Sequence, residues 1–407
     1  MSNDWHQNPA LIAAVGAVAG VLVTIAAAAL LWPDDSAADS GAEGVVSTPS
    51  VRPSPTRTDI LDPSSSEPTS DPNDEQGEDE GDDESDGSGK PEDAPPLTDA
   101  APAGEGDLPE SDAVTCPAAT TTVSDADQLQ AALDDAQPGD TIELQEGTYS
   151  GNFVTTASGT DAQPIFLCGS SDAVLDGGDV EGDYALHLDG AQYWRLVGFT
   201  VSGGQKGVVA DGTVGSVIQG LTVSGTGDEA VHLRSFSTDN VVLDNTISDT
   251  GNRRDKYGEG VYIGSAVSNW CTYTDCRADR SDRNVVKGNT ITDTSSEAID
   301  IKEGTTGGLI VDNTFDGSAM TGADSWVDVK GNNYLIQGNT GSSAPKNGMQ
   351  THQILPGWGD LNVFRGNSLD VDTSDYAIAS WPEESNVVTC DNTFVGADEG
   401  LSNIPCT

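Results

Sequence analysis

The sequence predicts an all-β fold, a right-handed parallel β-helix, over residues 113–407. The phrases GFT, GLT, DNT, GNT, DNT, GNT, GNS and DNT begin at residues 198, 220, 244, 288, 312, 338, 366 and 391, so the spacings are 22, 24, 44, 24, 26, 28 and 25. Each repeat holds short β-branched runs that alternate with period two and are broken by Gly, Asn, Asp and Ser. No helix fits between these runs, and the Leu positions of leucine-rich repeats are missing. Turns of this length with three short strands are typical of a parallel β-helix.

The spacing of 44 is one repeat plus an insertion of about 20 residues, which we place at 265–283. Asparagine falls at one place in the repeat, at residues 245, 289, 313, 339, 367 and 392. A row of this kind either binds a ligand or forms an internal ladder. Because asparagine side chains bond well at tight turns, we predict a ladder of amides that runs from coil to coil.

Three segments precede the repeats. Residues 9–32 carry no charge and are long enough to cross a bilayer core of about 30 Å. We expect a single transmembrane anchor there, with 1–8 as a short cytoplasmic tail, and a cleaved signal peptide is the alternative. Residues 33–112 are rich in acidic residues, Pro, Ser and Gly and poor in large apolar residues, which predicts a disordered acidic linker. The C-terminal domain is then extracellular at the cell membrane, or secreted.

A short helix is expected to cap the N-terminal end of the solenoid. Ser124 suits an N-cap, and DADQLQAALDDA after it is amphipathic, with Leu129, Ala132 and Leu133 on one face. A solenoid needs such a cap because its end coil otherwise exposes the core. PGDTIELQEGTY follows as a turn and the first strand.

The charge of the chain limits its partners. It has 67 acidic and 17 basic residues, a formal net charge of −50 at pH 7. Nucleic acids and anionic membrane surfaces are excluded as ligands, because both require clustered Lys and Arg. We expect the membrane to be contacted only through the N-terminal helix, and the protein to be monomeric.

Six cysteines lie in the repeat region, an even number behind an export segment, which predicts disulfides. Proximity in the sequence favours Cys271–Cys276 and Cys390–Cys406, leaving Cys116–Cys168, although the spacing alone leaves other pairings open.

One strand of each repeat can be aligned by its two inward apolar residues. The aligned segments are ALHLD (185–189), GVVAD (207–211), AVHLR (230–234), GVYIG (260–264), AIDIK (298–302), WVDVK (326–330), GMQTH (348–352) and YAIAS (376–380). The second and fourth positions point into the core, so the third and fifth face outward.

This alignment places like charges side by side on adjacent coils. Asp300 lies beside Asp328 and Lys302 beside Lys330, with Arg234, His232 and His352 near by and Glu259 and Glu297 just before the row. A surface ladder of Asp–Lys pairs would explain the residue types, but stacked like charges are unfavourable in a sheet. The row therefore favours a site that binds a cation and an anionic sugar.

The phrases SDADQLQAALDDAQPGDTIELQEGTYSG and SGTDAQPIFLCG resemble the opening of secreted β-helix polysaccharide lyases, in particular the alginate lyase/chondroitinase-B-like group and the lysine-base pectate lyases. In those lyases a Lys or Arg base stands on this sheet, close to acidic calcium ligands. The resemblance implies Lys302 as the base, with Lys330 as second choice. It implies Asp300, Asp328 and Glu297 as Ca²⁺ ligands, and Arg234 and His352 as groups that bind substrate carboxylates or assist proton transfer.

The remaining candidates are substrate-binding residues on or beside the row. They are His232, Tyr262, Gln350, Trp326, Trp358 and Trp381, of which the aromatic ones suit sugar stacking. We therefore predict a calcium-assisted lyase that cleaves an acidic polysaccharide. The alternatives are a glycoside hydrolase or epimerase on the same fold, and a surface solenoid that only binds or adheres to glycans.

Overall fold

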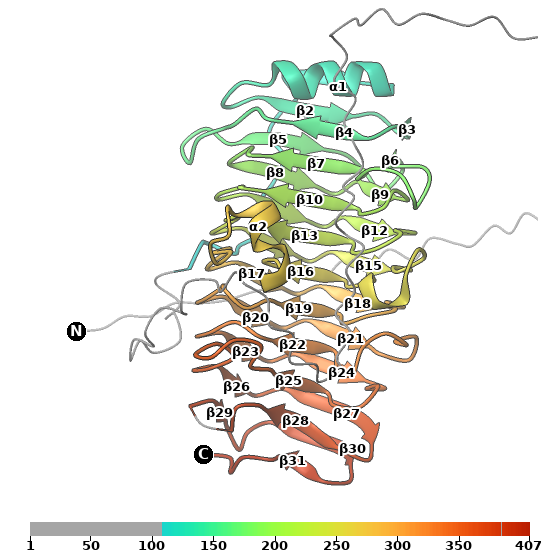
Figure 1. The fold of residues 1–407 in the computed structure, drawn as a ribbon. Coiled ribbons are helices and arrows are strands. Elements are labelled where there is room, and N and C mark those ends of the chain that lie inside the picture. The colour runs from blue at the N-terminus through green and yellow to red at the C-terminus, as the bar shows by residue number, and fades with distance from the viewer. Residues whose placement is uncertain (1–107, 384) are drawn as a thin grey trace, which may run out of the picture. The chain divides into compact units, whose positions relative to one another are not determined.

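The computed structural model describes residues 108–383 and 385–407. Over this range the chain winds into a right-handed parallel β-helix of about ten turns, as predicted (Figure 1). Each turn contributes one strand to each of three parallel sheets, because the three short β-branched runs of a repeat each pair with the same run of the next.

The three sheets are named here A, B and C. Sheet A contains β1 (Thr121–Val123), β2 (Thr141–Leu144), β5 (Ile165–Cys168), β8 (Trp194–Val197), β11 (Val217–Gln219), β14 (Val241–Leu243), β17 (Val285–Lys287), β20 (Leu309–Val311), β23 (Leu335–Gln337), β26 (Val363–Arg365) and β29 (Val387–Val388). Sheet B contains β3 (Gly147–Ser150), β6 (Ala173–Asp176), β9 (Thr200–Ser202), β12 (Thr222–Ser224), β15 (Thr246–Ser248), β18 (Thr290–Thr292), β21 (Thr314–Asp316), β24 (Thr340–Ser342), β27 (Ser368–Thr373) and β30 (Thr393–Ala397). Sheet C contains β4 (Phe153–Thr155), β7 (Leu186–Asp189), β10 (Val208–Asp211), β13 (Val231–Arg234), β16 (Val261–Ile263), β19 (Ile299–Ile301), β22 (Val327–Val329), β25 (Met349–Thr351), β28 (Tyr376–Ser380) and β31 (Gly400–Ser402).

The predicted asparagine ladder is confirmed, and it runs along the inside of one corner of the solenoid. Asn313 is representative: its Nδ2 donates to Asn339 Oδ1 at 3.0 Å and to Val286 O at 2.9 Å. Its Oδ1 accepts the backbone N–H of Asn289 at 2.9 Å. Each amide thus satisfies the backbone groups that the corner removes from the sheets, and it fixes the register of consecutive coils.

A second, shorter asparagine ladder was not predicted. It occupies another corner, where Asn240 Nδ2 donates to Asn284 Oδ1 at 3.1 Å and Asn362 N donates to Asn386 Oδ1 at 2.9 Å. The signal in the sequence was weaker because the intervening coils do not carry asparagine at every equivalent position.

Helix α1 (Ala126–Asp135) covers the N-terminal end of the solenoid (Figure 1). Leu129 and Leu133 are buried, as expected, but the N-cap is Asp125 rather than Ser124. Asp125 Oδ1 accepts the N–H of Gln128 at 2.9 Å, and the Gln128 side chain reaches back to the N–H of Ser124. The helix follows β1, so the strand in PGDTIELQEGTY is the second strand and not the first.

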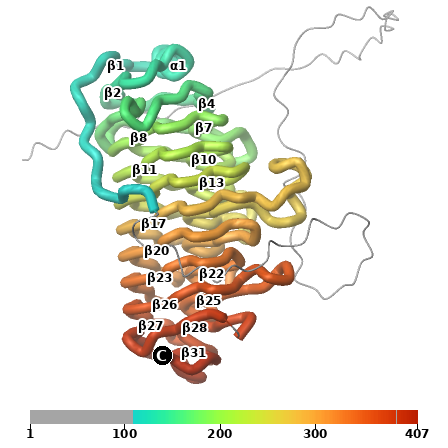
Figure 2. Tube along the Cα trace, turned by 90° about the vertical axis from the view of Figure 1, so that its left-hand side faces the viewer, coloured from blue at the N-terminus to red at the C-terminus, as the bar shows by residue number. Residues whose placement is uncertain are grey.

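The segment before β1 lies along the outer face of sheet A (Figure 2). Leu108 and Val114 pack on outward apolar residues of this sheet, which include Val217, Val241 and Val285. The segment is joined to β5 by the Cys116–Cys168 disulfide.

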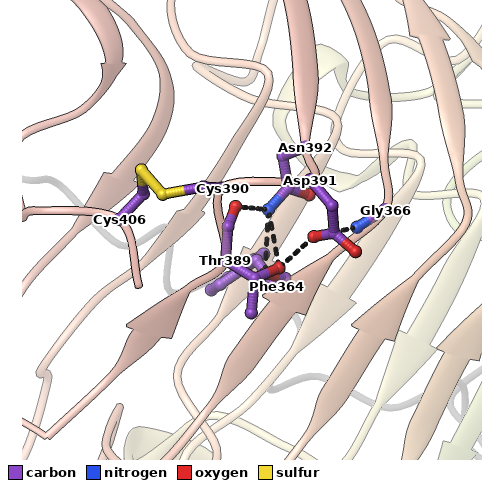
Figure 3. Close-up of a disulfide and its surroundings, with 7 residues drawn as sticks. All are labelled: Phe364, Gly366, Thr389, Cys390, Asp391, Asn392 and Cys406. Atoms are coloured by element: carbon purple, nitrogen blue, oxygen red, sulfur yellow. Dashed lines mark hydrogen bonds between the residues drawn. A yellow bond between two sulfur atoms is a disulfide. The ribbon is translucent and has the colours of Figure 1, made fainter.

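The two disulfides that sequence proximity favours are present, and so is the remaining pair, Cys116–Cys168. Cys271–Cys276 closes a loop within the insertion, which also contains the short helix α2 (Trp270–Tyr273). The Cys390–Cys406 disulfide, drawn in Figure 3, lies close to the C-terminus. It holds the C-terminal residues against β29, where Thr407 N donates to Val388 O at 3.0 Å. The C-terminal tail therefore covers the end of sheet A.

The alignment of the last outward segment, 376–380, was wrong by one residue. Met349 pairs with Ile378 and Gln350 with Ala379, so Ile378 points into the core and Ala379 takes its place on the outer face. A slip of one residue moves every side chain to the other face of a strand. The structure buries Ile378, the larger apolar side chain. The sequence left the register open because the alanines on either side of Ile378 fit the core as well.

Trp326 was expected on the outer face, but it is fully buried in the core. It stands at the corner before β22, where side chains do not yet alternate between the inner and outer faces as they do within a strand. Its ring fills the space beside Gly341 and Gly348, and a Cβ added to Gly341 would lie 2.3 Å from it. Neighbouring coils carry Phe315 and Leu369 in register with Gly341. The tryptophan thus replaces the apolar side chain that this coil lacks in sheet B.

The predicted tail, anchor and most of the linker (1–107) lie outside the described residues. Within the part of the chain that the structure describes, no helix is long and apolar enough to cross a bilayer.

We predict that Asn313→Ala destabilises the solenoid by about 3 kcal/mol, because it leaves several buried backbone and amide groups without partners. The exposed Asn152, whose Nδ2 donates to Tyr184 O at 3.0 Å, provides the control, and Asn152→Ala should cost less than about 1 kcal/mol. Urea unfolding followed by circular dichroism measures both. Equal losses in the two variants would contradict a structural role for the ladder.

Candidate functional site

The polar face of sheet C carries three rows of functional side chains at its middle coils. In chain order the rows are Glu229, Glu259 and Glu297 before the strands, His232, Tyr262, Asp300 and Asp328 at their centres, and Arg234, Gly264, Lys302 and Lys330 at their carboxyl ends. The parallel register brings each row together, since side chains at equivalent positions stand about 4.8 Å apart.

These rows form the floor of a cavity of about 370 Å³. One wall comes from the insertion, including Ser265, Asn269 and Tyr273, and the other from Lys256, Tyr257 and residues 321–324. The walls bury the central row although its side chains point away from the core: Asp300 and Asp328 are each only 2% exposed. The inserted segment thus forms one wall of an open cavity on this outer face.

Lys330 bridges Asp300 and Asp328, and Lys302 also contacts Asp300. Lys302 Nζ lies 3.0 Å from Asp300 Oδ2. Lys330 Nζ lies 3.1 Å from Asp300 Oδ1 and 3.0 Å from Asp328 Oδ2. The lysines therefore offset the repulsion between the stacked carboxylates that the sequence indicated.

The protonation states follow from these contacts. Burial alone would lower the pKa of Lys330, but the Asp300 and Asp328 carboxylates together raise it well above its usual value. Burial would raise the pKa of Asp328, and Lys330 and His352 overcome this and hold it well below its usual value. Lys330 is thus firmly protonated, which makes it a poor base.

The carboxyl group of Asp300 also lies close to two glutamate carboxyl groups. Oxygen atoms of Glu259, Glu297 and Asp300 lie within 4.8 Å of one another. Burial and the nearby Asp300 carboxylate raise the pKa of Glu297 to about 7. Burial, together with Glu229 and Glu297, raises the pKa of Glu259 well above its usual value. Glu259 Oε2 has no hydrogen-bond partner among the described residues. This cluster is therefore short of positive charge.

The predicted metal ligands differ from this cluster in one member. Asp300 and Glu297 are in it, but Glu259 takes the place expected for Asp328, which lies on the side of Lys330 and His352. The sequence shows that Glu259 stands just before its strand. Only the structure shows that its side chain, at the corner of the coil, lies near Asp300.

Two residues that line the cavity, Glu229 and Lys206, were not among those predicted from the sequence. Glu229 precedes its strand as Glu259 and Glu297 do, and its Oε2 lies 2.6 Å from the buried Lys206 Nζ. The other oxygen, Oε1, lies 3.4 Å from His232 Nδ1. The signal was present, since all three glutamates stand directly before an aligned segment.

Arg234, His232 and Tyr262 line the cavity with Lys302 and Lys330, as the row predicted. His232 packs against Tyr262, with ring centroids 4.4 Å apart, and its Nε2 faces Gly264 O at 3.0 Å. The Tyr262 ring centroid lies 5.1 Å from Lys302 Nζ.

The remaining candidates do not line the cavity. His352 contacts the site only through Asp328, with Nδ1 3.0 Å from Oδ2. Gln350 is buried and donates to Asp324. Trp326 and Trp358 are buried, and Trp381, at 46% exposure, is the one tryptophan of the three that presents a ring to solvent.

Comparisons with known proteins place the chain among parallel β-helix proteins. A crystal structure of alginate lyase from Paenibacillus sp. str. FPU-7 has 35% sequence identity and a TM-score of 0.66, and the match covers 71% of this chain and 100% of that one. Pectate lyase PEL9 of Emericella nidulans is 29% identical over 143 residues, 31% of this chain and 35% of that protein. The chain thus spans about a third of the length of this curated relative.

The family model described as periplasmic copper-binding protein (NosD) matches residues 144–340. Copper sites use His, Met and Cys ligands. Between residues 108 and 407, leaving out residue 384, the one group of three possible metal-binding His, Cys, Asp or Glu residues consists of carboxylates, and the six cysteines form disulfides.

His352 makes the stability of the site dependent on pH. The Asp328 carboxylate raises the pKa of His352 to about 9 from an ordinary 6.5. The charged pair therefore stabilises the fold fully below about pH 6.5, and this contribution is lost as the pH rises through about 9. We predict that His352→Gln costs on the order of 2 kcal/mol at pH 6 and little above about pH 10. Urea unfolding of both proteins across this range measures the difference, and a cost that does not change with pH would contradict the pairing.

Proposed function

We propose that this chain, which belongs to the same family of right-handed parallel β-helix proteins as the Paenibacillus alginate lyase, cleaves an acidic polysaccharide by β-elimination in the cavity on sheet C. The observation that carries the proposal is the convergence of Lys302, Lys330 and Arg234 with buried carboxyl groups in one cavity. A uronate chain needs positive charge to bind, and elimination needs a base beside the sugar ring.

Lys302 is the proposed base. Both lysines contact Asp300, and Lys302 lies beside the repelling charge of Lys330, whose pKa is raised well above its usual value. The neutral amine of Lys302 takes the C5 proton of the uronate and becomes an ammonium group. The electron pair of the C5–H bond forms a C4–C5 double bond, and the C4–O4 bond breaks.

The departing O4 needs a proton, and the Tyr262 hydroxyl is the proposed donor because Tyr262 lines the same cavity next to Lys302. Lys330 is firmly protonated and is suited to stabilise the carboxylate of the reacting sugar while C5 loses its proton. The product carries an unsaturated uronate at its new end.

Calcium fits the carboxyl cluster. Glu259, Glu297 and Asp300 offer the hard oxygen ligands that Ca²⁺ prefers, and the unpartnered Oε2 of Glu259 is a free ligand atom. A bound Ca²⁺ would supply positive charge next to Asp300, which would weaken the hold of that carboxylate on the Lys302 proton.

An extracellular location is part of the proposal. The three disulfides support an oxidising compartment. The uncharged run at 9–32 would then tether the domain to the membrane or direct its secretion.

We predict that the full-length protein releases unsaturated products from a polyuronate, and that Lys302→Ala lowers kcat by at least about a hundredfold, because a positioned base contributes that much. Ultraviolet absorbance of the product and a reducing-end assay are followed together on pectate, alginate and chondroitin. Lys287→Ala, on the outer face of sheet A, is the matched control and should keep full activity.

Two results would overturn the proposal. New reducing ends without absorbance would indicate hydrolysis, although the carboxyl oxygens of the cluster, within 4.8 Å, are closer than the 6.5–9.5 Å typical of inverting hydrolases. Silence in both assays, with binding retained, would indicate a glycan-binding solenoid.

We predict that calcium affinity rises with pH through about 7, by at least about tenfold per pH unit below it, because Ca²⁺ must displace the proton from Glu297, whose pKa is about 7, and the proton that the raised pKa of Glu259 retains. Calorimetry in two buffers of different ionisation enthalpy counts the protons released. Glu297→Gln should weaken binding, whereas Glu143→Gln on sheet A should not. Calcium binding that is independent of both pH and Glu297 would place the ion elsewhere.

A further inference from the structure

Arg234 has a hydrogen-bonding edge that the fold leaves unused. Its side chain is buried and lines the cavity, and its pKa lies above the ordinary value, so it is always charged. Its Nε donates to Asp211 Oδ1 at 2.8 Å and its Nη2 to Tyr184 Oη at 3.0 Å. Its Nη1 has no hydrogen-bond partner among the described residues. A buried guanidinium nitrogen without a partner is costly unless a ligand completes it.

The guanidinium is held in one orientation. Asp211, which fixes the Nε edge, is itself held by His187 at 2.8 Å and by the Ser235 hydroxyl at 3.0 Å. The ring of Tyr273 stacks on the guanidinium face, with its centroid 3.9 Å from Cζ. Stacking on the face and pairing on one edge leave the remaining edge for an in-plane acceptor such as a carboxylate.

The insertion at 265–283 is tied to the residue that follows Arg234. Asp279 Oδ2 accepts the Ser265 hydroxyl at 2.8 Å and the Ser235 N–H at 2.9 Å. Its Oδ1 accepts the Ser281 hydroxyl at 2.8 Å. One buried carboxylate therefore joins both ends of the insertion to β13, and Tyr273 is carried on this same insertion.

Arg234 and Lys302 stand at the same end of their strands, two coils apart. The intervening strand, β16, is followed by Gly264, which contributes no side chain between them. Two coils correspond to about 10 Å along the solenoid. If a substrate chain lies along the solenoid axis with its reacting sugar at Lys302, another sugar of the same chain would thus reach Arg234.

We propose that Arg234 and the insertion form a second anion subsite, which binds another carboxylate of the same substrate chain about two coils from the base. This inference rests on the proposed cleavage of a uronate chain at Lys302. It makes the substrate a chain with carboxylates on at least two sugars, and it explains why Arg234 is supported from both the Asp211 and the Tyr273 side.

The test compares uronate oligomers of increasing length with the full-length protein. For Arg234→Gln we expect KM to rise at least about tenfold for long oligomers, the loss of one charge-assisted hydrogen bond, with a much smaller change in kcat. The shortest oligomers that are cleaved should show no change, because they do not reach the subsite. Arg234→Lys should also raise KM, since an ammonium group lacks the planar fork. Arg365→Gln, an exposed arginine on sheet A, is the matched control.

The results separate this proposal from the activity itself. An equal KM in the wild type and Arg234→Gln on long oligomers, or a fall in kcat alone, would overturn the subsite. Calorimetric binding of a long uronate oligomer provides a measurement independent of turnover: a tenfold loss in both Arg234 variants supports the subsite even if no unsaturated product forms. No binding to the wild-type protein would overturn it. Thermal melts of all variants identify any loss of folded protein, and Arg234→Lys, which keeps a charge beside Asp211, decides the question if Arg234→Gln unfolds.

Discussion

Coil-to-coil register is the constraint on which the rest of this structure depends. The internal amides, of which Asn313 is one, accept and donate between consecutive turns and leave no freedom for one coil to slide on the next. Because the register is fixed, a residue at one place in a repeat always lies beside its equivalent in the next. The positions of Asp300 beside Asp328, and of Tyr262 beside Asp300, follow directly from it.

Such a lattice would be unfavourable if it stacked like charges without compensation. The structure compensates with two lysines: Lys330 bridges Asp300 and Asp328, and Lys302 contacts Asp300. The negative charge of Glu259, Glu297 and Asp300 is not fully compensated, and the pKa of Glu297 is raised to about 7. The site therefore contains firmly charged groups that suit substrate binding beside groups whose charge changes readily, which is the combination that proton transfer requires.

The cavity exists because two irregular segments rise from a regular solenoid. The insertion at 265–283 lengthens one turn and carries its own disulfide, which holds a short segment that has little core of its own. Its buried carboxylate, Asp279, connects it to β13. The regular coils thus supply the spacing of the functional groups, and the irregular ones supply burial, on which the pKa shifts and the exclusion of water depend.

The sequence by itself determined the fold class, the asparagine ladder and the rows that contain Lys302, Asp300 and Arg234, because all of these follow from a repeat period and the alternation of side chains. Only the tertiary structure decided where alternation stops. Trp326 and Glu259 both stand at corners before a strand, and one turns into the core while the other turns toward Asp300. At 376–380 the pattern allowed two registers, and burial of Ile378 selected one. Which loops cover the face, and hence which charges are buried, depends on contacts between segments far apart in the chain, which no local pattern records.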